Sequence, residues 1–283
     1  MNYYHTETVN DHITAIHSLT GEILYLVESS RGAALIDTCL GVGHLKALVD
    51  SLTEKPLTVL LTHGHLDHAQ GAPEFDTVYL NKKDLELYKK QSPWEERKGY
   101  IKSGVSPEEF AKLTDADFVP PMPEKEFSEL ADGMTFDLGG ISIQAFSYPG
   151  HTQGSMVFLL KEDRILILGD ACNNSTFLFG KETCSVEEYR ENTVKTARRL
   201  EGLYDRVFLS HKVMETGKEI LANMEELCGE IMEGKTDDLP FEFMGTKACI
   251  AKRCKEGFVR EDGKCGNLIY RKNHIWKDRR TEE

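Results

Sequence analysis

Long apolar runs are absent from this sequence of 283 residues, and their absence excludes a class of protein. No segment approaches the 18 consecutive apolar residues of a transmembrane helix, so we predict no membrane span and no membrane partner. Residues 1–17 also lack the charged and then apolar layout of a secretory signal peptide. We therefore expect a cytoplasmic protein whose seven cysteines are reduced thiols rather than a disulfide framework.

Basic residues are scarce relative to acidic ones. Lysine and arginine number 34 against 47 aspartates and glutamates, which gives a formal net charge of −13. The excess of acidic residues lies before residue 246, because residues 246–280 hold eleven basic and four acidic residues. An acidic body argues against nucleic-acid binding and leaves a small molecule as the expected partner. The basic C-terminal segment either meets an anionic partner or covers acidic surface of its own chain.

Internal repeats and low-complexity segments are also absent. A chain of this length can bury a large core, and we predict a single domain over residues 1–283. Residues 81 to about 127 are charged and helix-prone and interrupt the strand-rich pattern, so they are interpreted as an insertion. Residues from about 236 to 283 form a predicted C-terminal extension. The oligomeric state stays open.

Short apolar, β-prone runs recur along the chain between turn residues. They predict strands at 23–27, 33–37, 57–61, 78–80, 141–146, 155–160, 164–168 and 206–209. Helices are predicted at 44–52, from Ser106, from a capping box at Ser185 to about 203, and from a second capping box at Thr216 to Gly234. In the extension, 257–260 and 267–271 predict a hairpin around Asp262-Gly263.

Three histidines and one aspartate crowd into the six positions from His63 to His68, in a chain with only ten histidines. They directly follow the predicted strand 57–61, and strand ends are where α/β sheets place their ligand sites. Three later predicted strands are also followed by metal-capable side chains, at His151, Asp170 and His211. Four strands that end in this way indicate one shared site.

Imidazole and carboxylate groups suit zinc, iron or manganese. The lack of cysteine thiolates among these clustered residues argues against a closed structural zinc site. His63 and His65 alternate in sequence, so in an extended loop they could face one ion together. Asp67 and His68 do not easily share that ion and suggest a second one. Seven ligands are too many for one catalytic metal with an open position, but they suit two metals that share a carboxylate.

These motifs resemble the metallo-β-lactamase superfamily, whose signature is His-x-His-x-Asp-His followed by separate histidine, aspartate and histidine positions at strand ends. The resemblance covers about residues 13–215 without the insertion. It implies a first metal held by His63, His65 and His151, and a second held by Asp67, His68 and His211. It also implies that Asp170 bridges the two ions and that Asp37, at the end of an early strand, supports the ligands from behind.

The family implies an α/β fold, a four-layer αββα sandwich of two mixed β-sheets flanked by helices. It also implies two divalent ions, zinc above all, with iron or manganese as alternatives. A hydroxide between the ions would cleave a small ester, thioester, lactone or phosphoester, and Asp67 would act as the catalytic residue that orients it and takes its proton.

The motif around His151, together with an aspartate at the bridging position, resembles the glyoxalase-II-like and lactonase-like branches rather than the true β-lactamases. One alternative is an oxidoreductase of the same fold with a single iron, similar to the sulfur dioxygenases. Another is a non-catalytic binding protein, which the intact set of seven ligand positions disfavours.

Several residues outside the signature allow two interpretations. The aromatic side chains of the insertion line a substrate pocket as a lid, or they pack the insertion onto its own domain; they are Trp94, Tyr100, Phe110 and Phe118. Three C-terminal cysteines are ordinary thiols or, with His274, a further metal site; they are Cys249, Cys254 and Cys265. Cys39 and Cys172 are expected to be small buried side chains rather than nucleophiles.

Overall fold

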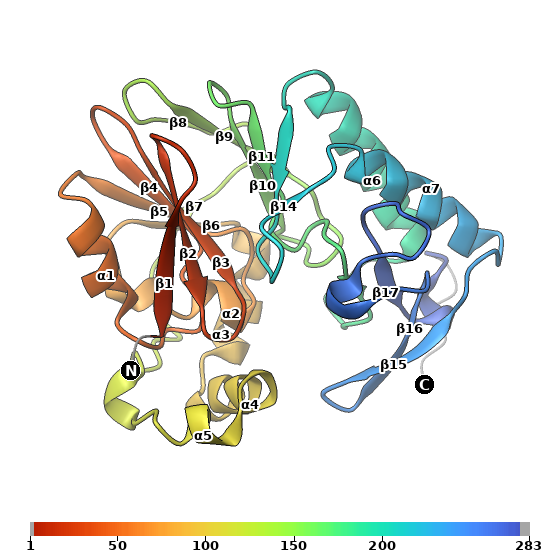
Figure 1. The fold of residues 1–283 in the computed structure, drawn as a ribbon, viewed down its shortest axis with the longest axis horizontal. Coiled ribbons are helices and arrows are strands. Elements are labelled where there is room, and N and C mark those ends of the chain that lie inside the picture. The colour runs from red at the N-terminus through yellow and green to blue at the C-terminus, as the bar shows by residue number, and fades with distance from the viewer. Residues whose placement is uncertain (1–2, 278–283) are drawn as a thin grey trace. The chain divides into compact units, whose positions relative to one another are not determined.

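The computed structural model describes residues 3–277, which fall into two compact units. The first unit holds residues 3–145 together with 210–212, and the second holds residues 146–209 together with 213–277. In Figure 1 the first unit runs from red to yellow-green, and the second from green to blue. The single domain predicted from the sequence stays a prediction.

The first unit is built on a seven-stranded sheet whose strands follow one another in sequence order (Figure 1). They are β1 (Tyr4–Thr8), β2 (Ile13–Ser18), β3 (Ile23–Glu28), β4 (Ala33–Ile36), β5 (Leu57–Leu60), β6 (Val78–Leu80) and β7 (Ser128–Glu129). Strands β1 to β4 pair antiparallel, whereas β4 to β7 pair parallel. The sheet is therefore mixed, and the parallel strands require crossover segments between them.

The central strands of this sheet are buried along most of their length. All four residues of β4 are buried, as are the first five residues of β3. The crossover from β4 to β5 contains α1 (Leu45–Leu52), which buries Leu45 and Val49 in the core of this unit. A hairpin of β8 (Thr135–Asp137) and β9 (Ser142–Ser147) follows later in the chain.

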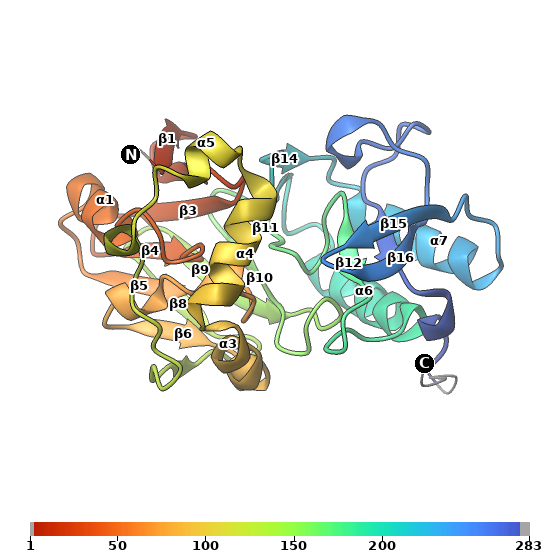
Figure 2. The same ribbon diagram turned by 90° about the horizontal axis from the view of Figure 1, so that it is seen from below.

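The predicted insertion is mostly helical, as its sequence indicates. It contains the 3₁₀ turn η2 (Lys82–Asp84), α3 (Leu85–Gln91), α4 (Trp94–Gly104), α5 (Pro107–Phe110) and the 3₁₀ turn η3 (Asp115–Asp117). The helix start predicted at Ser106 is confirmed, since the Ser106 side chain accepts a hydrogen bond from the Glu109 amide in a capping box. Both α3 and α4 contact the short helix α2 (Leu66–Ala69), which is labelled beside α3 in Figure 1, and Figure 2 draws α3 next to α4.

The second unit contains a sheet in the order β14-β13-β11-β10. Its strands are β10 (Met156–Leu160), β11 (Ile165–Ile167), β13 (Arg206–Phe208) and β14 (Glu215–Thr216). Two helices, α6 (Val186–Leu200) and α7 (Ile220–Met232), pack against each other. The capping box predicted at Ser185 is confirmed, because Ser185 and Glu188 exchange their hydrogen bonds at the start of α6.

A four-stranded sheet completes the second unit in the order β12-β17-β16-β15. Its strands are β12 (Thr176–Leu178), β15 (Leu239–Phe243), β16 (Thr246–Ile250) and β17 (Leu268–Tyr270), with the 3₁₀ turns η4 (Glu256–Phe258) and η5 (Lys272–His274) beside them. Strand β12 pairs parallel with β17, which pairs antiparallel with β16. The strands of the C-terminal extension thus share a sheet with residues 176–178.

Two local predictions are wrong. The hairpin lies at Met244-Gly245, between β15 and β16, instead of at Asp262-Gly263. Residues 257 and 258 both have positive φ, 72° and 61°, so 257–260 does not form an extended strand. The second capping box is also wrong, since Thr216 lies in β14 opposite Val207 and α7 begins at Ile220.

The eight strands predicted between residues 23 and 209 are all present, and their ends differ by one residue at most. The predicted stop of α7 is also present, with Gly234 at a φ of 69° just after the helix. Within residues 3–277, no helix is long and apolar enough to cross a membrane.

Candidate metal centre

The ligand loop, defined here as residues 62–70, begins where β5 ends and contains α2. His63, Asp67 and His68 are buried, and His65 is half-buried. His65 has extended backbone angles and immediately precedes α2, whose single turn carries Asp67 and His68. Four metal-capable side chains are therefore held on one short, mostly buried loop instead of on a solvated surface.

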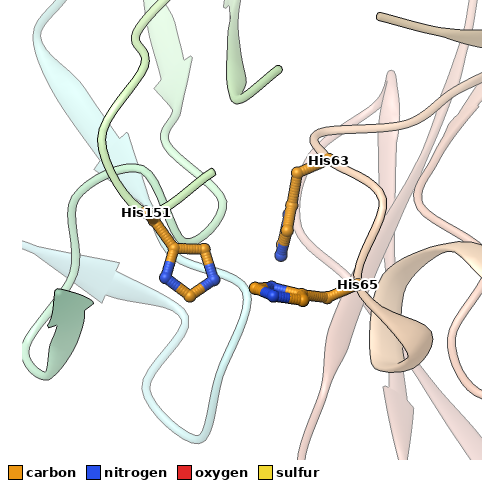
Figure 3. A group of neighbouring side chains, drawn as sticks. All are labelled: His63, His65 and His151. Atoms are coloured by element: carbon orange, nitrogen blue, oxygen red, sulfur yellow. The ribbon is translucent and has the colours of Figure 1, made fainter. Parts of the chain in front are cut away.

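His63 and His65 lie close together within this loop. Their ring centroids are 4.9 Å apart with the ring planes at 90°, and each offers a nitrogen within 4.8 Å of the other. Figure 3 shows the two imidazoles projecting from the loop after β5, and His151 from the loop after β9. The alternating positions of His63 and His65 thus bring two imidazoles together, as the sequence predicts.

A second group in the first unit contains Asp67, His68 and His211. The Nε2 atoms of His68 and His211 are 3.1 Å apart, and Asp67 Oδ2 lies 3.7 Å and 3.6 Å from them. Three donor atoms within 4.8 Å of one another form the arrangement that a metal ion requires. Two imidazoles and one carboxylate suit a divalent transition metal.

His211 reaches this group through a short piece of extended chain. Residues 210–212 pair with residues 21–23, with hydrogen bonds from the Ile23 amide to Ser210 and from the Lys212 amide to Gly21, both 2.8 Å. The backbone of Lys212 has a positive φ of 57°. The turn between β2 and β3 therefore fixes where His211 lies.

Asp37 ends β4 in the left-handed backbone region, with a φ of 65°, which aspartate tolerates better than most residues. Its carboxylate accepts hydrogen bonds from the Thr62 amide at 2.7 Å and from the Thr62 hydroxyl at 2.8 Å. Asp37 Oδ2 also lies 2.8 Å from His68 Nδ1. The carboxylate therefore engages Nδ1 and leaves Nε2 of His68 as the ligand atom.

Thr62 is a residue that the sequence did not single out. Its hydroxyl donates to Asp37 and lies 3.0 Å from His63 Nδ1, so the same hydroxyl accepts from that ring nitrogen. This bond directs Nε2 of His63 away from Thr62. The only sequence signal for this role is the position of Thr62 between the strand and the first histidine.

In the second unit, His151 and Asp170 also lie close together. His151 Nε2 is 3.8 Å from Asp170 Oδ2, and His151 Nδ1 donates to the Phe177 carbonyl at 2.9 Å. Asn173 holds the other carboxylate oxygen of Asp170 at 3.1 Å. The loop before His151 needs Gly150, because a Cβ there would lie 2.4 Å from the Tyr189 ring. His151 is thus a third histidine whose Nδ1 is held by a protein acceptor.

Side chains of the insertion form hydrogen bonds with the ligand loop. The Tyr100 hydroxyl donates to Asp67 Oδ2 at 2.7 Å, and the side chains of Asp84 and Gln91 accept from the Gly64 and Leu66 amides at 3.0 Å and 2.8 Å. Asp84 is buried. Sequence reasoning placed Tyr100 in a lid and missed Asp84 and Gln91, because polar residues on a charged segment carry no periodic signal.

The other insertion aromatics divide between the two interpretations. Phe118 is buried in the core of the first unit, and Phe110 packs against it, so packing is confirmed for both. Trp94 lines a surface pocket with Pro93 and Pro121. A lid function for Trp94 and Tyr100 stays a prediction.

The cysteines divide into buried and partly exposed thiols. Cys39 and Cys172 are fully buried, as predicted, and burial raises the pKa of the Cys172 thiol to about 12. Burial likewise raises the pKa of Cys39 well above its usual value. Within residues 3–277, the structure gathers no metal-capable group that includes Cys249, Cys254 or Cys265.

A family model described as "Metallo-beta-lactamase superfamily" matches residues 24–211, more than half of the chain. Among curated proteins, an atrochrysone carboxyl ACP thioesterase of Aspergillus chevalieri is 28% identical over 156 residues, which are 54% of this chain and 40% of that protein. The acyl-coenzyme A thioesterase MBLAC2 of Bos taurus is 27% identical over 207 residues, which are 65% of this chain and 68% of that protein. The chain thus spans less than half the length of the fungal relative.

Solved structures show the same architecture. A metallo-beta-lactamase from Pontibacter korlensis superimposes with a TM-score of 0.56 at 16% identity, over 79% of this chain and 97% of that one. The sec-alkylsulfatase Pisa1 from Pseudomonas sp. gives a TM-score of 0.62 at 13% identity, over 82% of this chain and 42% of that one. At such identities the likeness establishes the fold alone. The predicted α/β fold class, with mixed sheets and helices, is confirmed.

Proposed function

Because the chain belongs to the metallo-beta-lactamase superfamily, we propose that it is a metal-dependent hydrolase of small thioesters. The convergence of Asp67, His68 and His211 within 4.8 Å is the observation that carries the proposal. The choice of thioesters, among the esters, lactones and phosphoesters that the family also suggests, rests on the fungal and bovine relatives, which are both named thioesterases.

The proposed centre holds two divalent ions, with zinc as the proposed metal and iron or manganese as alternatives. The ligands are assigned as in the family, with His63, His65 and His151 on one ion, Asp67, His68 and His211 on the other, and Asp170 on both. The donor chemistry supports this assignment. Three of the histidines have Nδ1 engaged, with Thr62, Asp37 or Phe177, and each therefore offers Nε2 to a metal.

The protein groups around the centre have separate proposed tasks. When bound, such ions polarise a carbonyl oxygen and lower the pKa of coordinated water to about 7. Asp67 is the proposed proton acceptor, and Tyr100 holds its carboxylate through the bond at 2.7 Å. Asp37 keeps the His68 ring in place. In the overall reaction water adds to the thioester carbonyl, the carbon–sulfur bond breaks, and an acid and a thiol are released.

The test is thiol release from a panel of acyl-coenzyme A thioesters, measured with a thiol-reactive dye on the metal-loaded full chain. Wild-type protein should release thiol, and Asp170→Ala should lose this activity together with bound metal while keeping a cooperative unfolding transition. Wild-type protein that takes up metal but cleaves no thioester of the panel contradicts the proposal. Oxygen consumption by an iron-loaded preparation would instead favour the oxidoreductase alternative.

A further inference from the structure

Five phenylalanines of the second unit form one aromatic group, called here the phenylalanine cluster: Phe177, Phe179, Phe241, Phe243 and Phe258. They come from β12, the residue after it, β15 and η4. The Phe177 ring centroid lies 4.7 Å from Phe179, 5.7 Å from Phe241 and 5.5 Å from Phe243. Phe258 adds a further ring, 6.2 Å from Phe241.

The strands that carry the cluster are the two edges of the four-stranded sheet. In the order β12-β17-β16-β15, β12 and β15 are separated by two strands, yet Phe177 and Phe241 are in ring contact. Side chains from the two edge strands therefore meet on one face of the sheet, and Figure 2 shows β12, β15 and β16 lying together. The rings form one continuous apolar surface.

This surface is not fully covered within its own unit. Phe179 is buried, together with Ala248 and Ile269 beneath the rings, whereas Phe177, Phe241, Phe243 and Phe258 are only half-buried. Two side chains next to the cluster in sequence are exposed as well, Met244 by 57% and Val259 by 50%. Contiguous apolar surface left open to solvent marks binding sites.

The cluster is joined to a proposed metal ligand. The Phe177 carbonyl accepts the hydrogen bond from His151 Nδ1 at 2.9 Å, so the residue that carries the central ring also orients that ligand. Strand β12 is itself held in the sheet by the Thr176 amide, which donates to Asn267, and by pairing with β17. A molecule bound on the rings therefore lies beside the loop that carries His151.

We propose that the phenylalanine cluster binds the apolar acyl chain of the thioester substrate. This inference rests on the proposed function and names the part of the substrate that the second unit recognises. Phenylalanine rings offer no hydrogen-bonding atoms, so they favour the hydrocarbon portion of an acyl thioester over its polar thiol portion. The cluster selects substrates by chain length, while the ligands act on the carbonyl carbon.

The test measures binding apart from chemistry. The probes are S-methyl, S-butyl and S-octyl thioethers of pantetheine, which lack the scissile carbonyl, titrated calorimetrically into the zinc-loaded full chain. Each methylene that reaches the rings should tighten binding by up to about fourfold. The double variant Phe241→Ala/Phe243→Ala should bind the S-octyl probe about 10- to 200-fold more weakly and the S-methyl probe as wild type does. Phe241 and Phe243 contact the ring of Phe177 and not the carbonyl that accepts from His151, so metal content should stay unchanged.

Phe136→Ala is the matched control, because Phe136 is a half-buried strand phenylalanine of the first unit that packs on Tyr79. It should leave the chain-length dependence intact. The wild-type series alone overturns the proposal if the S-methyl and S-octyl probes bind equally, even where the double variant fails to fold. A chain that sediments as a dimer and becomes a monomer in the double variant also overturns it, since the rings then form a subunit interface.

The thioester panel separates this inference from the proposed function. Chain-length-dependent binding without any thiol release means that the cluster binds acyl chains but that the hydrolase proposal fails. Thiol release that is indifferent to acyl length means that the hydrolase proposal stands and the acyl-binding proposal fails.

Discussion

Asp37 and Thr62 set the directions of two imidazole rings through a few short hydrogen bonds. Asp37 accepts two bonds from Thr62 and engages His68, while the Thr62 hydroxyl accepts from His63. The family resemblance pointed to Asp37 because it matches a known position, whereas the only sequence signal for Thr62 was its place between the strand and the first histidine. A hydroxyl that bonds to two partners depends on how the end of β4 meets the ligand loop, and local sequence does not encode that.

Tyr100 is the insertion residue with a direct contact to the proposed proton acceptor. Tyr100→Phe removes the bond of 2.7 Å to Asp67 Oδ2 and keeps the ring and its packing. A hydrogen bond to a charged group contributes about 1.5–3 kcal/mol, so kcat should fall roughly 10-fold or more while metal content and KM stay close to wild type.

The matched control is Tyr204→Phe, which removes an exposed hydroxyl bonded to the Lys218 carbonyl and should not change kcat. If Tyr100→Phe turns over thioesters at the wild-type rate, Tyr100 serves packing alone.

At the scale of elements, the strands before the proposed ligands were predictable with their bounds, whereas the insertion was predictable as helix-prone but without the bounds of α3 and α4. Apolar runs marked β5 and β11 because β11 is buried throughout and β5 buries its last two residues, Val59 and Leu60. Helix α4 gave no apolar stripe, since its buried residues are Arg97 and Ile101, and Arg97 donates to the carbonyls of Leu40 and Val119. A buried arginine that satisfies backbone carbonyls has the sequence pattern of a solvated one.

Gly64 shows how closely the insertion approaches the ligand loop. A Cβ at this position would lie 2.7 Å from the Asp84 carbonyl oxygen and 2.8 Å from the Asp84 Cβ, and both atoms are held by neighbouring backbone. Gly64→Ala should therefore cost about 1–3 kcal/mol of unfolding free energy, as overpacking does, and weaken metal binding through the displaced loop.

Gly99→Ala provides the control in the same insertion, because a Cβ there would meet nothing within 4 Å and the residue lies inside α4. It should raise the unfolding free energy by about 0.4–1 kcal/mol, because alanine lowers the conformational entropy of the unfolded chain. Denaturant unfolding of both variants measures these changes. Equal unfolding midpoints for Gly64→Ala and Gly99→Ala would contradict the prediction, because the insertion would then move aside at Gly64 without cost.

For the whole molecule, the signature led to the superfamily, and the family match to residues 24–211 confirms that prediction. The C-terminal extension was the least predictable part. The strand predicted at 267–271 is present as β17, but its partner β12 lies some 90 residues earlier in the chain, and local sequence carries no signal for such a distant pairing. The roles assigned to the seven ligands stay predictions, five of them on residues of the first unit and two, His151 and Asp170, on residues of the second.

Metal stoichiometry tests the molecule as a whole, because neither unit alone carries the full proposed ligand set. Elemental analysis of zinc-, iron- or manganese-loaded protein should find about two ions per chain, as expected for a two-metal hydrolytic centre. Metal binds the folded chain in preference to the unfolded one, so chelation should lower the unfolding midpoint and added zinc should restore it. The variant His151→Ala/Asp170→Ala removes both ligands of the second unit, and it should lose metal and most of the zinc-dependent rise in that midpoint. A folded preparation that never holds more than one ion with any of the three metals contradicts the dinuclear centre.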